Sequence, residues 1–60
     1  MSMYIQTDKN QIQLVSKLII NEFHYNFIIV NNKLIFTHKV NIDPIEKLLK
    51  RNYLKYKLYK

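Results

Sequence analysis

No cysteine occurs in this chain of sixty residues, so no disulfide can hold its fold together. A single domain of this size, residues 1–60, buries only about 60% of the surface that its unfolded chain exposes, which leaves it marginally stable. The soft metal ligands are His24, His38 and two methionines, too few for a structural zinc site. Apolar packing must therefore supply the stability, and a homodimer is the usual way to bury more apolar surface.

The formal charge of +6 lies entirely in the second half of the chain. Residues 1–30 carry two basic and two acidic side chains, whereas residues 31–60 carry eight basic and two acidic ones. This asymmetry predicts an acidic partner, of which nucleic acid is the most common. Ile, Asn, Lys, Tyr and Phe make up more than half of the chain, which is the bias of A/T-rich codons and is typical of phages and mobile elements of low-GC bacteria.

The first ten residues, MSMYIQTDKN, lack the basic, apolar and small-residue segments of a secretory signal. The longest uninterrupted apolar run is FIIV, which is far too short to span a membrane. We therefore expect no membrane contact and a cytoplasmic location, in the cytoplasm of the host cell if a phage encodes the chain.

Alternation of side chains predicts a short strand over residues 3–7, in which Tyr4 and Gln6 share one face. A helix is expected over residues 8–23, with Asp8 as its N-cap. At about 100° per residue, one face of that helix collects apolar side chains, which predicts that it packs on a core. These residues are Ile12, Val15, Leu18, Ile19 and Phe23.

The segment 24–40 predicts a β-hairpin, because two runs of β-branched and aromatic residues flank Asn31 and Asn32. Asparagine tolerates the positive φ of a tight turn, and a two-residue loop pairs Val30 with Lys33. The two strands then alternate between a core face and a second face that is half apolar. The core face carries Phe27, Ile29, Leu34 and Phe36, and the second face carries Ile28, Val30 and Ile35.

A second helix is expected to begin with Asp43 at the N-cap, Pro44 at the first helical position and Glu46 in the first turn. Its buried stripe comprises Ile45, Leu48 and Leu49. Where this helix ends decides the fold class, because the last stretch, YLKYKLYK, fits two structures.

If the helix continues through residues 53–60, Leu54 and Leu58 lie opposite its buried stripe and are free to meet a second subunit. If it stops near Asn52, Leu54, Tyr56 and Leu58 alternate with lysines as in a half-buried strand. Both versions are α+β, with a small antiparallel sheet and two helices on one face. We favour the three-stranded order β-α-β-β-α, because the four-stranded, ferredoxin-like order β-α-β-β-α-β is hard to fit into so few residues.

Residues for catalysis are scarce. Without glycine there is no phosphate-binding loop, and without cysteine there is no thiol nucleophile. Helix capping accounts for Asp8, Asp43 and Glu46, which leaves Glu22 alone. We therefore expect no catalytic residue, no metal, no cofactor and no enzymatic activity. A nuclease that depends on His38 is the one catalytic alternative.

The basic and aromatic C-terminal half carries the strongest functional signal, because lysines contact phosphates and tyrosine rings stack on bases or fill protein pockets. Alternatively, these lysines form a solvated helix face and the tyrosines belong to the core. The residues expected to bind a polyanion or partner are Lys47, Lys50, Arg51, Tyr53, Lys55 and Lys57. A second, apolar set is expected to serve self-association or partner contact and comprises Ile28, Val30, Ile35, Leu54 and Leu58.

These features lead to two functional hypotheses. In the first, the protein is a non-enzymatic accessory protein of a phage or mobile element. It forms a homodimer and acts as an inhibitor by stoichiometric binding to a host protein or nucleoprotein complex. In the second, the Lys- and Tyr-rich C-terminal segment binds nucleic acid directly and without sequence preference.

Overall fold

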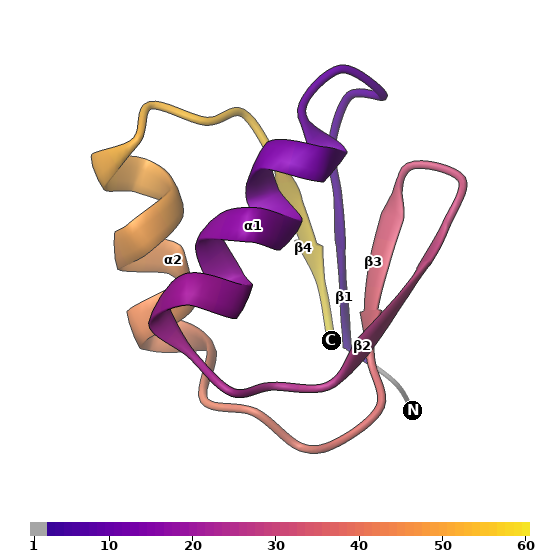
Figure 1. The fold of residues 1–60 in the computed structure, drawn as a ribbon, viewed down its shortest axis with the longest axis vertical. Helices are drawn as coiled ribbons and strands as arrows, with labels where there is room; N and C mark the ends of the chain where they lie inside the picture. Colours follow the sequence, from indigo (N-terminus) through magenta and orange to yellow (C-terminus); the bar gives the residue numbers. More distant parts are fainter. Residues whose placement is uncertain (1–2) are drawn as a thin grey trace.

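Strands and helices follow one another in the order β-α-β-β-α-β in the computed structural model, which describes residues 3–60 (Figure 1). The strands are β1 (Tyr4–Gln6), β2 (Phe27–Val30), β3 (Lys33–Phe36) and β4 (Lys57–Tyr59), and the helices are α1 (Ile12–Glu22) and α2 (Ile42–Arg51). All strand pairs are antiparallel, and the strand order is β2-β3-β1-β4. The predicted α+β fold is therefore confirmed, in its four-stranded, ferredoxin-like version.

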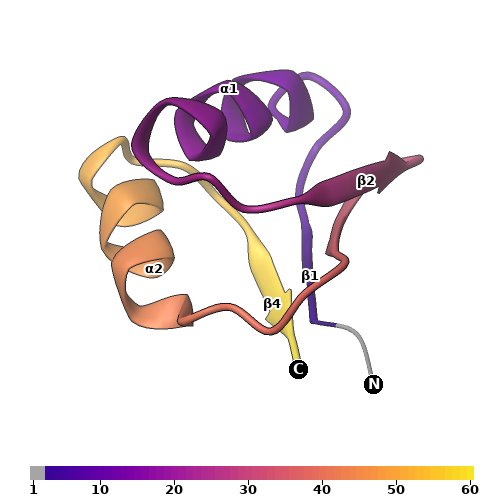
Figure 2. The ribbon, with the colours of Figure 1, turned by 60° about the horizontal axis from the view of Figure 1, so that its bottom comes forward.

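Both helices lie on the same side of the sheet (Figure 2). Between the helices and the sheet lies one hydrophobic core to which both helices and the strands β1 and β3 contribute. Its buried members are Ile5, Ile12, Val15, Ile19, Leu34, Phe36, Ile45 and Leu49. The opposite face of the sheet carries no helix within residues 3–60 and is called the open face.

The hairpin forms with the predicted register, in which Val30 pairs with Lys33. Asn31 has a φ of 57°, the positive value that the two-residue turn requires. Leu34 is fully buried on the core face, whereas Ile28 is 52% exposed on the open face. The separation of the two faces that the sequence predicted is therefore confirmed, but Ile29, which was predicted to lie in the core, is 37% exposed because it lies on the edge strand β2.

The first helix begins later than predicted, because Gln11 and not Asp8 stands at its N-cap. Asp8 instead accepts hydrogen bonds at its carbonyl from the N–H groups of Gln11 (2.9 Å) and Ile12 (3.0 Å). The preceding residue, Thr7, is held at the end of the sheet, since its hydroxyl donates to the Lys55 carbonyl at 2.9 Å. The residues between Thr7 and α1 turn the chain from the sheet into the layer of the helices, so the helix begins only after them.

The second helix begins earlier than predicted, at Ile42, with Asn41 as its N-cap. The Asn41 side chain accepts a hydrogen bond from the N–H of Asp43 at 3.2 Å. This start places Ile42 one turn before Ile45, and both side chains pack in or against the core. Pro44 still lies in the first turn, where its missing N–H has no intrahelical partner.

The second helix ends at Arg51, so its predicted continuation through residues 53–60 is wrong. Tyr53 has a φ of 58°, and its N–H donates to the Lys50 carbonyl at 3.0 Å. The N–H of Leu54 donates to the Leu49 carbonyl at 3.1 Å. These two bonds form a Schellman motif, which turns the chain out of the helix and towards the sheet.

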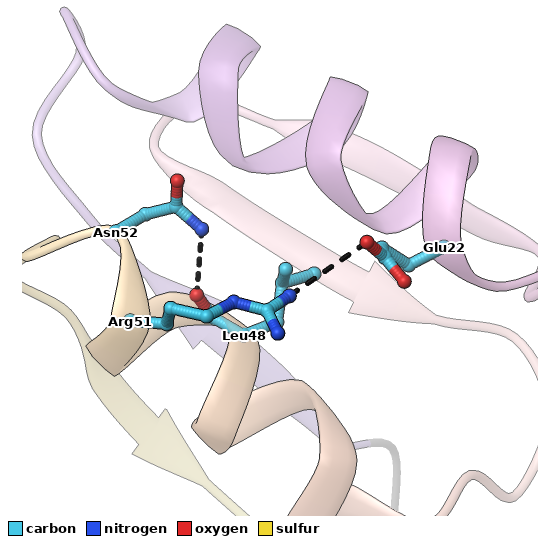
Figure 3. Close-up of polar contacts among 4 residues, drawn as sticks. All are labelled: Glu22, Leu48, Arg51 and Asn52. Carbon is cyan, nitrogen blue, oxygen red and sulfur yellow. Dashed lines mark hydrogen bonds and ion pairs between the residues drawn. The ribbon is translucent and has the colours of Figure 1, made fainter.

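A hydrogen bond and the packing of three side chains also favour the end of α2 at Arg51. The Asn52 side chain donates to the Leu48 carbonyl at 2.8 Å, which satisfies a carbonyl at the helix C-terminus (Figure 3). Leu54, Tyr56 and Leu58 all pack against the core from the last segment. A continued helix would place the two leucines among lysines in solvent. The strand buries them, and this burial favours the strand over the helix in a small domain.

Replacement of Tyr53 by glycine should stabilise the fold. Tyr53 is 93% exposed and occupies the left-handed position where glycine is preferred, because its Cβ crowds the following carbonyl. We expect Tyr53→Gly to raise the free energy of unfolding by about 1 kcal/mol, as measured by urea denaturation. Tyr53→Ala removes the ring but keeps the Cβ, so it should give no such gain. Equal stability of the two variants would contradict this interpretation.

Candidate functional site

Two cross-strand rows of side chains cover the open face. Residues directly opposite each other in antiparallel strands share a face, so the register fixes the members of each row. The first row is Ile28, Ile35, Tyr4 and Tyr59, and the second row is Val30, Lys33, Gln6 and Lys57. Each row crosses all four strands in the order β2-β3-β1-β4.

The apolar half of the open face consists of Ile28, Val30 and Ile35 on strands β2 and β3. Ile28 is 52% exposed and Val30 is 47% exposed, while Ile35 is half-buried between its neighbours. The structure thus brings together three members of the apolar set that the sequence predicted. An uncovered group of large aliphatic side chains is a feature of surfaces that contact other macromolecules.

The other half of the open face is built around Tyr4. The Tyr4 and Tyr59 rings stack with their centroids 4.7 Å apart and their planes at 15°. The Lys33 ammonium lies 5.2 Å from the centroid of the Tyr4 ring. Lys33 comes from β3 and Tyr59 from β4, the two strands that flank β1 on opposite sides. The Lys33 ammonium, the Tyr4 ring and the Tyr59 ring therefore lie in a row across the sheet, which we call the Lys33–Tyr4–Tyr59 column.

One aromatic face at the end of this column has no strand beside it. Strand β4 is an edge strand, so no described strand covers the side of Tyr59 that is turned away from Tyr4. The Tyr59 side chain is 38% exposed. A planar group that packs on this ring would extend the column by offset stacking, an arrangement that aromatic rings favour.

The open face is positively charged, because its two rows contain Lys33 and Lys57 and no acidic side chain. The acids are elsewhere in the fold. Glu22, at the end of α1, lies 3.7 Å from the Arg51 guanidinium of α2 (Figure 3). Both partners are exposed, so water screens this pair. The pair offsets the charge of Glu22 on the helix side of the fold.

A pocket of about 320 Å³ adjoins the second row at the end of the sheet. It lies between the end of β1, the hairpin turn and the segment that leads into β4, and the hydroxyl of Thr7, the residue after β1, donates a hydrogen bond to that segment. The pocket is lined by Gln6, Thr7, Asp8, Asn32, Lys55, Tyr56 and Lys57. Gln6 and Lys57 belong to both the pocket and the open face, so the pocket adjoins the lysines of that face, and Asp8 adds one acidic side chain to its wall.

The predicted polyanion-binding residues do not form one surface. Residues of α2 and residues near β4 lie on different sides of the fold, since the exposed side of α2 points away from the sheet. Lys47, Lys50 and Arg51 are exposed on α2, Tyr53 is exposed in the turn after it, Lys55 lines the pocket, and Lys57 lies on the open face. The charge of the C-terminal half is therefore divided between the helix layer and the sheet.

Leu54 and Leu58, which were expected to contact a partner, pack against the core instead. Their expected role assumed a continued helix. In the structure Leu58 belongs to β4 and lies opposite Ile5 on the core side of the sheet, so it does not face a partner. The apolar residues that are available to a partner on the open face are therefore those of β2 and β3.

Sequence reasoning missed Tyr4 and Lys33 as members of the site, and it included Tyr59 only as one of the tyrosines of the C-terminal half. Tyr4 was placed correctly on the face opposite the core side of its strand, but nothing local in the sequence shows which strands flank it. The strand alternative for the last segment contains the missing signal, because pairing of that strand with the first brings Tyr59 beside Tyr4.

The histidines and acids do not converge. His24 and His38 are both exposed and lie outside the helices and strands. Within residues 3–60, no group of three or more His, Cys, Asp or Glu side chains is arranged to hold a metal ion. Among the same residues, neither helix is long and apolar enough to cross a membrane.

Comparison of the chain with models of protein families, with curated proteins and with solved structures gave no match. The ferredoxin-like strand order describes a topology and does not by itself indicate a function. Inference about function therefore rests on the geometry and charge of the chain itself.

Tyr56, in the pocket wall, has a raised pKa. Its burial disfavours the charged phenolate, and the negative charge of Glu46 together with a 3.3 Å hydrogen bond from the Tyr56 hydroxyl to Glu46 adds to the effect. The pKa of Tyr56 is therefore above the usual value of 10.0. A pKa that is raised in the folded state means that Tyr56 contributes stability below pH 10.0, which is lost as the pH rises through the raised pKa.

We predict that Glu46→Gln lowers the pKa of Tyr56 towards its usual value, because the variant removes the negative charge and keeps a hydrogen-bond acceptor. The measurement is an alkaline titration of tyrosinate absorbance in the folded protein. Tyr56→Phe identifies the phenol, since it should remove the late-titrating component from the curve. Superimposable titration curves for the wild type and Glu46→Gln would show that Glu46 does not influence Tyr56.

Proposed function

We propose that the protein acts by stoichiometric binding and not by catalysis, and that its open face binds single-stranded nucleic acid. The observation that carries this proposal is the Lys33–Tyr4–Tyr59 column on a sheet face without acidic side chains. Proteins that bind single strands combine positive charge along the backbone with aromatic rings on which bases stack. The open face offers both within one surface.

In this arrangement a base stacks on the free face of Tyr59 and extends the column. Lys33 and Lys57 then contact the phosphates on either side of that base. Lys55, in the pocket, lies where the nucleic-acid strand leaves the sheet. A duplex does not fit this mode, because its bases are stacked on one another and do not reach the ring. Contacts of this kind read no base edges, so we expect binding without strong sequence preference.

The apolar half of the open face favours a second candidate function. Half-exposed Ile28 and Val30 are suited to the apolar centre of a protein interface. In this version the protein binds a host protein, or the protein part of a nucleoprotein complex, and inhibits it as an accessory protein of a phage or mobile element. With either candidate, the proposed place of action is the cytoplasm of the host cell.

The first test compares two double variants that change the charge equally. Lys33→Glu with Lys57→Glu reverses both lysines of the open face, whereas Lys47→Glu with Lys50→Glu reverses two lysines of α2. We expect the first pair to abolish binding of a fluorescent single-stranded oligonucleotide, measured by anisotropy, and the second pair to weaken it only slightly. In the wild type, affinity should fall as salt rises, with each phosphate contact contributing about 0.7 to the slope of log K against log salt.

The same assay tests stacking. Tyr59→Leu keeps an apolar side chain on β4 but removes the ring, and it should weaken binding by about tenfold or more, since a stacked base contributes on the order of 1–3 kcal/mol. Tyr53→Leu is the matched control, because it removes an exposed ring that lies outside the open face. An oligonucleotide that stays unbound at low salt would exclude the nucleic-acid proposal and leave the protein partner as the leading one.

A further inference from the structure

The two edges of the sheet differ in the protection that they carry. Strand β4, at one edge, has the charged residues Lys57 and Lys60 in and beside it, and charge on an edge strand opposes pairing with another chain. Strand β2 lies at the other edge (Figure 1). Its sequence is Phe-Ile-Ile-Val, which contains neither charge nor proline. In addition, Ile29 is 37% exposed on the side of the helices. Strand β2 is therefore the unprotected edge.

The backbone of β2 presents unpaired polar groups at this edge. The N–H of Thr37 donates to the Asn26 carbonyl at 3.1 Å, so Asn26 is directed towards β3. Antiparallel strands alternate the direction of their N–H and C=O groups residue by residue. Ile28 and Val30 are therefore also directed towards β3, and the N–H and C=O groups of Phe27 and Ile29 point out of the sheet.

We propose that β2 pairs with β2 of a second copy of this chain, and that the two sheets join into one continuous antiparallel sheet of a two-fold symmetric dimer. Charge identifies the occupant. The chain carries a formal charge of +6, but residues 23–32 contain no Lys, Arg, Asp or Glu. Two copies can approach along this neutral segment, whereas approach through the lysines of α2 or β4 brings like charges together.

Symmetry, side-chain direction and the outward polar groups of Phe27 and Ile29 together select the register of the joint. Both copies keep their helices on the same side of the joined sheet only if residues of the same face meet. Pairing Ile28 with Ile28 of the second copy satisfies this requirement. It also places Phe27 opposite Ile29 of the second copy, so each of these pairs uses the outward N–H and C=O groups in an exchange of hydrogen bonds.

The helix layer adds apolar surface to the same joint. Glu22 of α1 reaches Arg51 of α2, and Ile20 lies on the opposite flank of α1 at about 100° per residue. Ile20 is therefore directed away from α2 and towards the β2 edge, where its side chain is 56% exposed. In the dimer, Ile20 and Ile29 of both copies cover the helix side of the joint, and Ile28 covers the open face.

The dimer is tested by size-exclusion chromatography with light scattering, from micromolar to millimolar protein. We expect the wild type to form dimers and Ile28→Lys to raise the dimer Kd on the order of a hundredfold, because it places two lysines opposite each other and removes apolar contact. Leu14→Lys is the matched control, since Leu14 is 47% exposed on α1 and lies outside the joint. That variant should dimerise like the wild type.

Amide hydrogen exchange of the wild type tests the β2–β2 pairing even if Ile28→Lys does not fold. The amides of Phe27 and Ile29 should become protected as protein concentration rises, whereas those of Ile28 and Val30 should be protected at every concentration. A wild-type monomer at all concentrations, a dimer that survives Ile28→Lys, or concentration-independent exchange at Ile29 would each overturn the proposal. No step requires nucleic acid, so this proposal and the proposed function fail separately.

Discussion

The pairing of β4 with β1 is the interaction on which the rest of the structure depends. It makes β1 a central strand, which directs Ile5 and Leu58 into the core and sets Tyr4 beside Tyr59 on the open face. In a domain of sixty residues the core has few members, so the extra burial that β4 brings is a large part of the available stability. The same pair of strands therefore supports both the fold and the candidate site.

The absence of glycine influences how the chain reaches this topology. Two turns require a positive φ, and they are made by Asn31 in the hairpin and Tyr53 after α2. Asparagine adopts that conformation readily, whereas tyrosine does so against the crowding of its Cβ. The Schellman hydrogen bonds and the burial of Leu54 hold Tyr53 in place and leave its ring in solvent. Tertiary packing here outweighs a local preference.

Local patterns predicted the parts of the fold that local contacts determine. The hairpin register followed from a two-residue turn, and the stripe of Ile45, Leu48 and Leu49 followed from helical periodicity. The end of α2 could not be predicted in this way, because the spacing of leucine and tyrosine in the last segment fits both a helix and a strand. The choice depends on β1, which lies at the other end of the sequence.

The candidate site was predicted only in part for the same reason. The apolar half lies within the hairpin, so its members could be grouped from the sequence. The column combines Tyr4, Lys33 and Tyr59 from three strands, and only the sheet order brings them together. This order has a mechanical consequence. Because β1 and β4 are antiparallel with Tyr4 beside Tyr59, a force that pulls on these two residues loads the strand pair one hydrogen bond at a time, as in a zipper. The pair formed by the first and last strands therefore resists pulling from those ends only weakly, and an unfolding motor that gripped the chain there would begin by separating the stacked rings.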